Sequence, residues 1–218
     1  AEVLIVDRHG EAAAKVAADL GGDSRAVDLT DPHAVAGLDL DADVLVNGAG
    51  VQHVAPIEEL DPARFELLHR LMLVAPFLLT QQVLPGMYHR QWGRIVHISS
   101  VHGHRASAYK SAYVSAKHGL EGLSKVIALE GAERGVTSNT VCPGYVRTPM
   151  VEGQIADQAQ AHGIPESDVV DDVLLARTPL KRLVEPEEVA ETVAFLCGPA
   201  AASVTGSSLR IDGGWTAA

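Results

Sequence analysis

Short apolar runs and helical patterns alternate along most of the chain. Strand-like runs occupy residues 3–6, 26–28, 44–46, 94–98, 137–142 and 208–211. Amphipathic helical patterns occupy residues 11–20, 62 to about 90, about 109 to 134, and 186–196. Because runs such as 44–46 are wholly apolar, we expect helices to cover both faces of the sheet. The alternation therefore predicts an α/β fold, Rossmann-like and doubly wound, around a mostly parallel sheet.

The chain shows no internal division. No repeat, low-complexity tract or long Pro/Gly/Ser linker interrupts the 218 residues, so we expect a single domain over residues 1–218. Hydrophobic residues make up 47% of the chain but aromatic residues only 4%, so aliphatic side chains must build the core. Between about 150 and 182 the sequence is polar, rich in Gln and Asp, with a weak helical signal. Such an insertion is a candidate lid over a substrate.

Composition also excludes some classes of function. The 17 Lys and Arg against 28 Asp and Glu give a net charge of −11, which opposes nucleic-acid binding. The longest strongly apolar stretch, residues 71–79, would reach only about 14 Å as a helix, too short to cross a bilayer. Residues 1–7 lack a basic leader and are expected to form a strand rather than an export signal. Cys142 and Cys197 fit no disulfide framework. We predict a cytoplasmic protein.

Residues that follow the strands are the first candidates for ligand binding, because open α/β sheets bind ligands beyond the carboxyl ends of their strands. After the first strand, the carboxylate of Asp7 is suited to hydrogen bonding with a ribose and repels a 2′-phosphate, which favours NAD over NADP. A solvated turn explains an aspartate at this position equally well. Asp28 suits either an adenine contact or the start of a helix at Asp31-Pro32. The small residues of Asn47-Gly48-Ala49-Gly50 permit close approach of a flat ligand, although an ordinary turn has the same composition.

Three residues carry a specific chemistry. Ser99-Ser100 ends a predicted strand, and Tyr113 and Lys117 lie four residues apart on a predicted helix, on one face. A neighbouring ammonium favours a phenolate, so Lys117 is expected to lower the pKa of Tyr113 toward neutrality. Tyr113 is then a general base, and the Ser100 hydroxyl holds the reacting oxygen.

The histidines do not predict a metal site. The chain has 10 histidines, including His102 and His104, which are two residues apart. No third ligand follows them at a spacing typical of zinc sites. We therefore expect no catalytic metal.

Together these motifs resemble the short-chain dehydrogenase/reductase family over essentially all 218 residues. The resemblance implies a catalytic Ser100, Tyr113 and Lys117. It also matches the family's Asn-Asn-Ala-Gly turn to residues 47–50 and its Pro-Gly turn to residues 143–144. The cofactor-binding residues that it implies are Asp7, Asp28, Asn47, Ala49, Gly50, Tyr113, Lys117, Pro143, Gly144, Val146 and Thr148.

Within the family, the chain looks like those members that oxidise D-3-hydroxybutyrate to acetoacetate with NAD. The resemblance implies that the substrate lies among Gln52, Ser100, His102, Lys110, Tyr113, Tyr145 and Gln154. A small hydroxy acid offers little apolar area, so its affinity must come from charge-assisted hydrogen bonds of about 1.5–3 kcal/mol each. In this interpretation Lys110 supplies the charge. The resemblance also implies a homotetramer built through the long helices and the C-terminal segment.

Two other functions remain as alternatives. One is an NADPH-dependent carbonyl or 3-oxoacyl reductase. Asp7 argues against NADPH, and the residues expected to bind a carboxylate argue against a long acyl carrier. The other is a catalytically silent protein that binds a dinucleotide or only assembles through its helices. The triad of Ser100, Tyr113 and Lys117 argues against this second alternative.

The sequence departs from the family pattern inside the long helix. Met72 occupies a position where many relatives have an active-site asparagine, and Pro76 follows four residues later. Because proline has no N–H, the carbonyl of Met72 loses its helical partner. We hypothesise that this carbonyl binds a water of the proton relay from Tyr113 through Lys117.

A second departure concerns the start of the chain. Only six residues precede Asp7, where the family has a first strand, a glycine-rich phosphate turn and a helix. In the doubly wound order that strand is central, so the strands on either side of it are expected to lack a neighbour. We therefore expect this sequence to be an N-terminally incomplete form of a longer protein, without the backbone N–H groups that hold a pyrophosphate.

Overall fold

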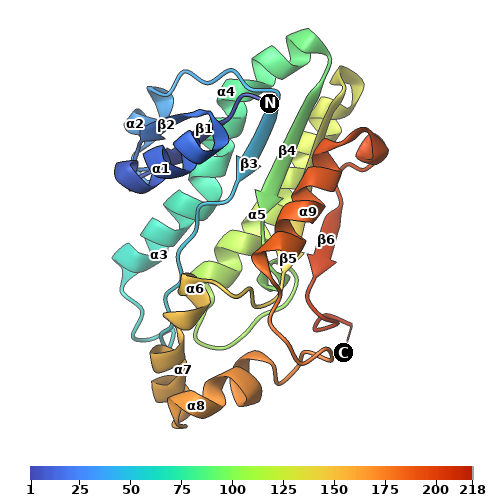
Figure 1. Ribbon diagram of the computed structural model, residues 1–218. Coiled ribbons are helices and arrows are strands. Elements are labelled where there is room, and N and C mark those ends of the chain that lie inside the picture. Colours follow the sequence, from blue (N-terminus) through green and yellow to red (C-terminus); the bar gives the residue numbers. More distant parts are fainter. Residues whose placement is uncertain (218) are drawn as a thin grey trace.

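The computed structural model of the protein describes residues 1–217 (Figure 1). Its strands are β1 (Leu4–Asp7), β2 (Asp23–Ala26), β3 (Val44–Asn47), β4 (Gly93–Ile98), β5 (Val136–Pro143) and β6 (Ser208–Ile211). Its α-helices are α1 (Gly10–Leu20), α2 (Pro32–Ala36), α3 (Pro62–His69), α4 (Ala75–Arg90), α5 (Ser111–Gly131), α6 (Pro149–Glu152), α7 (Ile155–His162), α8 (Glu166–Val169) and α9 (Pro186–Cys197). Single turns complete the order: π-helical η1 (Arg70–Val74) and η4 (Val170–Leu174), and 3₁₀-helical η2 (Val101–Gly103), η3 (Ala132–Arg134) and η5 (Pro199–Ala201).

All the strand pairs are parallel, as predicted, but they form two sheets. One sheet has the order β3-β4-β5-β6 and the other contains β1 and β2. Within residues 1–217, β1 pairs only with β2, and β3 pairs with β4. The expectation that β1 and β3 each lack a neighbour on one side is therefore confirmed.

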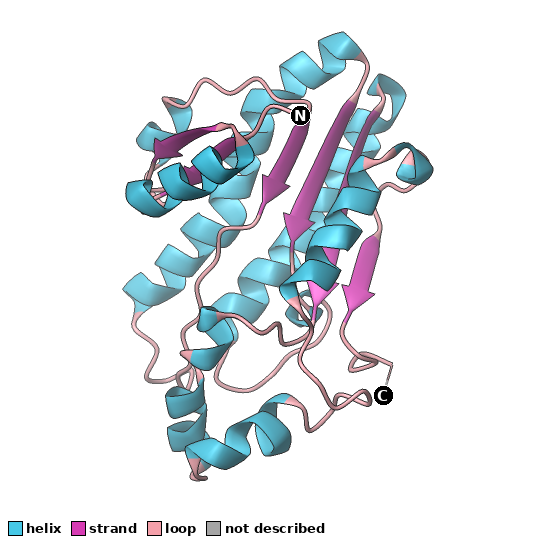
Figure 2. Cartoon of the chain, viewed as in Figure 1, coloured by secondary structure: helices cyan, strands magenta, loops and turns pink. Residues whose placement is uncertain are grey.

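Helices cover both faces of the larger sheet (Figure 2). Adjacent residues of β4 point to opposite faces, as the period of a strand requires. Ile95 packs with Val83 of α4 and Ile127 of α5, whereas Val96 packs with Leu196 of α9. The strands of this sheet point toward α6, α7 and α8, so these short helices lie beyond the carboxyl ends (Figure 1). The doubly wound prediction is confirmed.

The predicted long helix extends from Pro62 to Arg90 as α3, η1 and α4. It is the one helix in the described part of the chain that has the length and composition to cross a membrane. However, Met72, Val83 and Met87 of this helix are almost completely buried among other core residues. It is therefore a core helix of the α/β fold.

One predicted strand boundary was wrong, and one segment is more helical than expected. The second strand covers Asp23–Ala26 rather than residues 26–28, because this polar strand takes its register from β1 and Asp28 instead forms a turn with Thr30. The segment 150–182 is more helical than its composition predicts. It contains α6, α7, α8 and η4, which bury a small apolar cluster of Val151, Ala159, Val169 and Leu174.

The packing of α9 on the sheet gives a prediction about stability. Leu196 is 0% exposed, so Leu196→Ala should lower the free energy of unfolding by about 2–5 kcal/mol. Leu20 is 56% exposed, and Leu20→Ala should change it by less than about 0.5 kcal/mol. Urea unfolding of both variants measures this difference. Equal losses would show that the α9 face does not hold the core together.

Candidate active site

A cleft of about 280 Å³ opens at the carboxyl ends of β4 and β5. It brings together residues from the loops after β3, β4 and β5 and from the start of α5. The predicted residues that line it are Gly50, Gln52, Ser100, His102, Lys110, Tyr113, Lys117, Pro143, Gly144, Tyr145, Val146, Thr148 and Gln154. Residues separated by up to a hundred positions in the sequence thus meet in one place, as expected for a doubly wound sheet.

The end of β4 fixes Ser100 and His102. Ser100 has extended backbone and caps η2, where its hydroxyl accepts a hydrogen bond from the backbone N–H of His102 at 3.2 Å. The Nδ1 atom of His102 lies 3.3 Å from the same hydroxyl, and its Nε2 atom lies 3.0 Å from Ser107 Oγ. Burial lowers the pKa of His102 to about 3, and Lys110 acts in the same direction, so the imidazole is neutral.

The first turns of α5 carry the other two members of the triad. Tyr113 and Lys117 lie one turn apart, which places both side chains on the face toward the cleft. Lys117 Nζ donates a hydrogen bond of 2.7 Å to the backbone oxygen of Ile98, at the end of β4. The same ammonium lies 5.5 Å from the centre of the Tyr113 ring. The predicted juxtaposition of Ser100, Tyr113 and Lys117 is present.

The expected pKa of Tyr113 was wrong in direction. Burial raises the pKa of this phenol, and hydrogen bonding with Ser100 only opposes the increase. Burial also lowers the pKa of Lys117 to about 8, while Cys142 and Glu121 act to raise it. Desolvation is therefore the largest influence on the pKa values of both groups, since burial disfavours the phenolate and the ammonium alike.

Lys110 is a buried cation in the same cleft. Its side chain is 2% exposed, and its Nζ atom donates to Tyr145 Oη at 3.1 Å. Among the described residues, no Asp or Glu oxygen lies within 4 Å of this ammonium. Burial lowers its pKa to about 8. Because a buried charge is normally paired, the cleft is suited to an anionic ligand.

Further polar atoms face this part of the cleft. Gln154 Nε2 donates to the backbone oxygen of Met150 at 2.9 Å, whereas Gln154 Oε1 is buried and has no hydrogen-bond partner. Gln52 Oε1 accepts from the backbone N–H of His53 at 2.9 Å, which leaves its side-chain NH₂ as a donor. Donors and an acceptor thus line the same cleft as Lys110.

The opposite part of the cleft contains the predicted cofactor residues. Gly144 leaves little room for a side chain, because a Cβ atom there would lie 3.2 Å from the Cα atom of Asp212. Tyr145 and Arg147 form backbone hydrogen bonds with Val184, so the segment after β5 forms a rigid wall. Thr148 begins α6, and its hydroxyl donates to the oxygen of Val146 at 3.3 Å. These small or flat surfaces beside Tyr113 and Lys117 fit a nicotinamide and its ribose.

Four predicted cofactor residues do not line this cleft: Asp7, Asp28, Asn47 and Ala49. Asp7 is exposed, and its carboxylate accepts from the backbone N–H of His9 at 2.8 Å. Asp28 accepts from both the N–H and the hydroxyl of Thr30, which lowers its pKa. Asn47 Nδ2 contacts His97 Nδ1 at 3.1 Å, but Asn47 Oδ1 is buried without a partner.

Met72 lies in the π-helical turn η1 immediately before Pro76. The N–H of Ala75 bonds to the oxygen of Arg70, five residues earlier, which is the π-helical register. Pro76 has no N–H to offer the carbonyl of Met72, as predicted. The Met72 side chain is buried with Ala112, Ala116 and Tyr113. A π-turn therefore marks the departure from the family pattern, and such turns are frequent at functional sites.

Sequence reasoning did not identify several lining residues. They are Gly48, Ile98, Ser99, Met150, Val151, Pro186 and Val189. Trp215 was also missed as a neighbour of the site, although its ring centre lies 5.7 Å from that of His102. Gly48 and Ser99 adjoin predicted residues and could have been found from the strand ends. The apolar residues of α6 and α9 carry no such signal, because apolar positions on helices are usually explained by core packing.

Comparison with known proteins agrees with this geometry. A family profile described as enoyl-(acyl carrier protein) reductase, of the short-chain alcohol dehydrogenase type, matches residues 1–216. The chain belongs to the short-chain dehydrogenase/reductase family. A relative named D-beta-hydroxybutyrate dehydrogenase, from Rhizobium meliloti (strain 1021), is 48% identical over 176 residues. The alignment covers 81% of this chain and 68% of that protein.

Solved structures of family members share the fold. Actinorhodin polyketide ketoreductase with NADPH superposes with a TM-score of 0.91 and 33% identity, over 98% of this chain and 87% of that one. A mutant 4-hydroxyisoleucine dehydrogenase complexed with NADH and succinate superposes with a TM-score of 0.87 and 27% identity, over 100% and 89%. The short-chain dehydrogenase/reductase fold thus extends over the whole chain, which is an oxidoreductase of this family.

A buried histidine behind the cleft gives a prediction about acid stability. Burial lowers the pKa of His97 to about 4, and Lys117 acts in the same direction. In the unfolded chain this histidine takes up a proton near pH 6.5, whereas in the folded chain it does so only near pH 4. The free energy of unfolding therefore falls as the pH decreases from about 6.5 toward about 4, by at most about 1.4 kcal/mol per pH unit. His97→Asn should make this decrease shallower in urea unfolding. The exposed His89→Asn should leave the slope unchanged, and equal slopes for the two variants would contradict the prediction.

Proposed function

We propose that the protein is an NAD-dependent dehydrogenase of a small hydroxy acid, and that it interconverts D-3-hydroxybutyrate and acetoacetate. The observation that supports this substrate class best is the buried ammonium of Lys110, which has no carboxylate partner among the described residues. The name of the Rhizobium meliloti relative gives independent support.

The proposed substrate has a carboxylate and a hydroxyl, and different residues of the cleft match each group. A carboxylate placed against Lys110 would gain a charge-assisted hydrogen bond, with Gln52 and Gln154 beside it. The secondary hydroxyl of a short acid would then lie near Ser100 and Tyr113. A cleft of about 280 Å³ suits a small molecule rather than a long acyl chain.

The residues of the triad have separate tasks in this proposal. Tyr113 accepts the proton of the substrate hydroxyl, and Ser100 donates a hydrogen bond to the same oxygen. Lys117 holds the nicotinamide ribose and favours the phenolate. When bound, NAD supplies the acceptor for the hydride that leaves the carbon. Because burial raises the pKa of Tyr113, the proton transfer needs the hydrogen bond from Ser100 and the charge of Lys117 together.

The choice of NAD rests on Asp7. Asp7 is the last residue of β1, where its carboxylate suits a ribose hydroxyl and repels a 2′-phosphate. The segment from α6 to η4 lies beyond the strand ends and contributes Met150, Val151 and Gln154 to the cleft, which supports a role as a lid that excludes water.

Two wider expectations belong to the same proposal. Large apolar side chains remain exposed on α4 and α5, among them Phe77, Val126 and Leu129, which supports a homotetramer formed through the long helices. Cys142 and Cys197 are free thiols, which supports a reducing, cytoplasmic location.

The role of Tyr113 is tested by removing only its hydroxyl. Tyr113→Phe should lower turnover of D-3-hydroxybutyrate with NAD about 10²- to 10⁴-fold, because the general base is lost. Nicotinamide absorbance measures turnover, and fluorescence titration measures NAD binding, which should persist. Tyr88→Phe, on α4, is the matched control. Unchanged turnover in Tyr113→Phe would refute the mechanism, and a wild-type preference for NADPH with oxoacyl substrates would refute the substrate assignment.

The role of Lys110 is tested by comparing a charged substrate with an uncharged one. Lys110→Met should lower kcat/KM for D-3-hydroxybutyrate about 10- to 150-fold, the equivalent of one charge-assisted hydrogen bond. It should have little effect on an uncharged secondary alcohol such as 2-butanol. Because the pKa of Lys110 is about 8, the preference of the wild type for the acid should decline as the pH rises above that value. The exposed Lys125→Met is the control, and equal losses for both substrates would contradict the assignment.

A further inference from the structure

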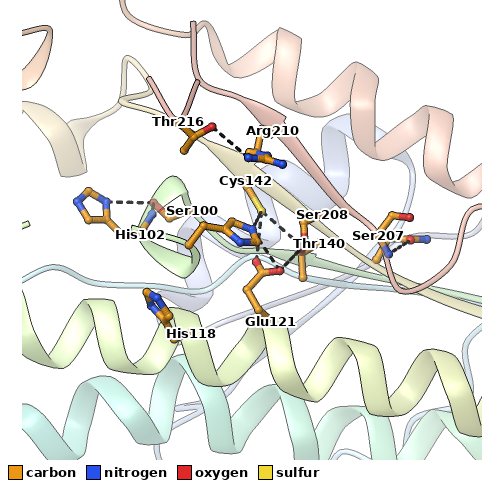
Figure 3. A network of polar contacts seen from close by, with 12 residues as sticks. Ser100, His102, His118, Glu121, Thr140, Cys142, Ser207, Ser208, Arg210 and Thr216 are labelled. Carbon is orange, nitrogen blue, oxygen red and sulfur yellow. Dashed lines mark hydrogen bonds and ion pairs between the residues drawn. The ribbon is translucent and has the colours of Figure 1, made fainter. Parts of the chain in front are cut away.

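Behind the cleft, three ligand-type side chains from different elements meet. His104 follows η2, Glu121 lies on α5, and Cys142 lies near the end of β5. His104 Nε2 is 3.5 Å from Glu121 Oε2 and 3.6 Å from Cys142 Sγ, and the thiol donates to Glu121 Oε1 at 3.2 Å. Figure 3 shows Glu121 and Cys142 pointing toward each other. None of the three was identified as a functional residue from the sequence.

The separations from His104 Nε2 to Cys142 Sγ and to Glu121 Oε2 match two edges of a zinc coordination tetrahedron, and the ligand atoms of the three residues all lie within 4.8 Å of one another. With zinc bonds of about 2.3 Å to sulfur and about 2.0–2.2 Å to nitrogen or oxygen, tetrahedral angles place the ligand atoms about 3.4–3.6 Å apart. The observed separations of 3.5 and 3.6 Å lie close to these values. The imidazole contacts Oε2 of the carboxylate and the thiol contacts Oε1, so both carboxylate oxygens face the other two ligands. Little movement is needed to admit an ion.

The carboxylate is already ionised and oriented. Thr140 Oγ1 and Ser208 Oγ donate to Glu121 Oε2 at 2.9 and 2.6 Å. Although burial opposes ionisation, the hydrogen bonds from Ser208 and Thr140 hold the pKa of Glu121 below its usual value. Hydrogen bonds of this kind fix a metal-binding carboxylate in position.

No Lys or Arg contacts the carboxylate of Glu121 in the described part of the chain. The Glu121 side chain is 5% exposed. Buried charges in proteins are normally paired or coordinated to a metal. The side chain of His104 is 26% exposed, so the cluster has access to solvent on one side.

We propose that His104, Glu121 and Cys142 form a binding site for a zinc ion, separate from the catalytic triad. Sulfur, imidazole and carboxylate ligands are the set that this borderline-soft ion prefers. On binding, the S–H bond of Cys142 is broken, its proton leaves to solvent and a sulfur–zinc bond forms, without any change of oxidation state. The exposed side at His104 leaves the fourth position to water.

Such an ion would connect the two segments that carry the triad, α5 and the loop after β4, with the end of β5. Glu121 lies one turn beyond Lys117 on α5, Cys142 directly precedes the Pro143-Gly144 turn, and His104 closes the loop that begins at Ser100. The proposed role is therefore to stabilise the arrangement behind the cleft. It does not depend on which alcohol the enzyme oxidises, so the two proposals fail independently.

Metal binding to the whole protein tests the site. After treatment with a chelator, the protein should bind one Zn²⁺ in competition with a chromogenic chelator, and Zn²⁺ should raise the melting temperature. Co²⁺ should give a thiolate-to-cobalt charge-transfer band, which requires a cysteine ligand. Cys142→Ser should abolish that band, and both Cys142→Ser and His104→Asn should weaken Zn²⁺ binding at least about tenfold.

Two control variants distinguish this site from surface binding. Cys197→Ser removes the other thiol, and His89→Asn removes an exposed imidazole, and both should retain the band and the affinity. If Cys142→Ser does not fold, as judged by circular dichroism, the partly exposed His104→Asn decides the result. The proposal is overturned if the wild type binds no Zn²⁺, if the cobalt band is missing, or if either ligand variant binds as tightly as the controls.

Discussion

The hydrogen bond from Lys117 Nζ to the oxygen of Ile98 is the interaction on which the site depends. It joins the first turns of α5 to the end of β4, and so fixes the distance between the side chains of Tyr113 and Ser100. The cost of burying an ammonium is offset by a charge-assisted bond to a backbone oxygen that the sheet itself holds in place. Every other element of the site is positioned relative to this contact.

Desolvation is the dominant electrostatic effect in the cleft. It raises the pKa of Tyr113 and lowers the pKa values of His102, Lys110 and Lys117, so each group is shifted toward its neutral form. The pKa values of the two lysines are thereby brought to about 8, closer to neutral pH, whereas those of His102 and Tyr113 are moved away from it. The same burial that makes the lysines costly for folding thus makes them sensitive to an anionic ligand.

Much of the fold could be predicted from the sequence, because the periodic pattern reflects which faces are buried. The apolar run at 44–46 and the long helix from Pro62 to Arg90 are examples. The boundary of β2 could not, because Arg25 and Asp23 give it no apolar pattern, and its register depends on β1. Ser100, Tyr113 and Lys117 could be predicted because strand ends and helical spacing bring them together. His104, Glu121 and Cys142 could not, since only the packing of α5 on β5 places them side by side.

The turn after β6 has a consequence for how the enzyme matures. The carboxylate of Asp212 accepts hydrogen bonds from Gly214, Thr216 and the Thr216 hydroxyl, and this turn holds Trp215 beside His102. Trp215 and His102 lie far apart in the sequence, so they meet only when β6 has joined the rest of the sheet. Contacts between such distant positions form slowly. A chain in which β3, β4 and β5 have paired but β6 has not would lack this contact, so catalytic competence would require the docking of β6 and of the turn that follows it.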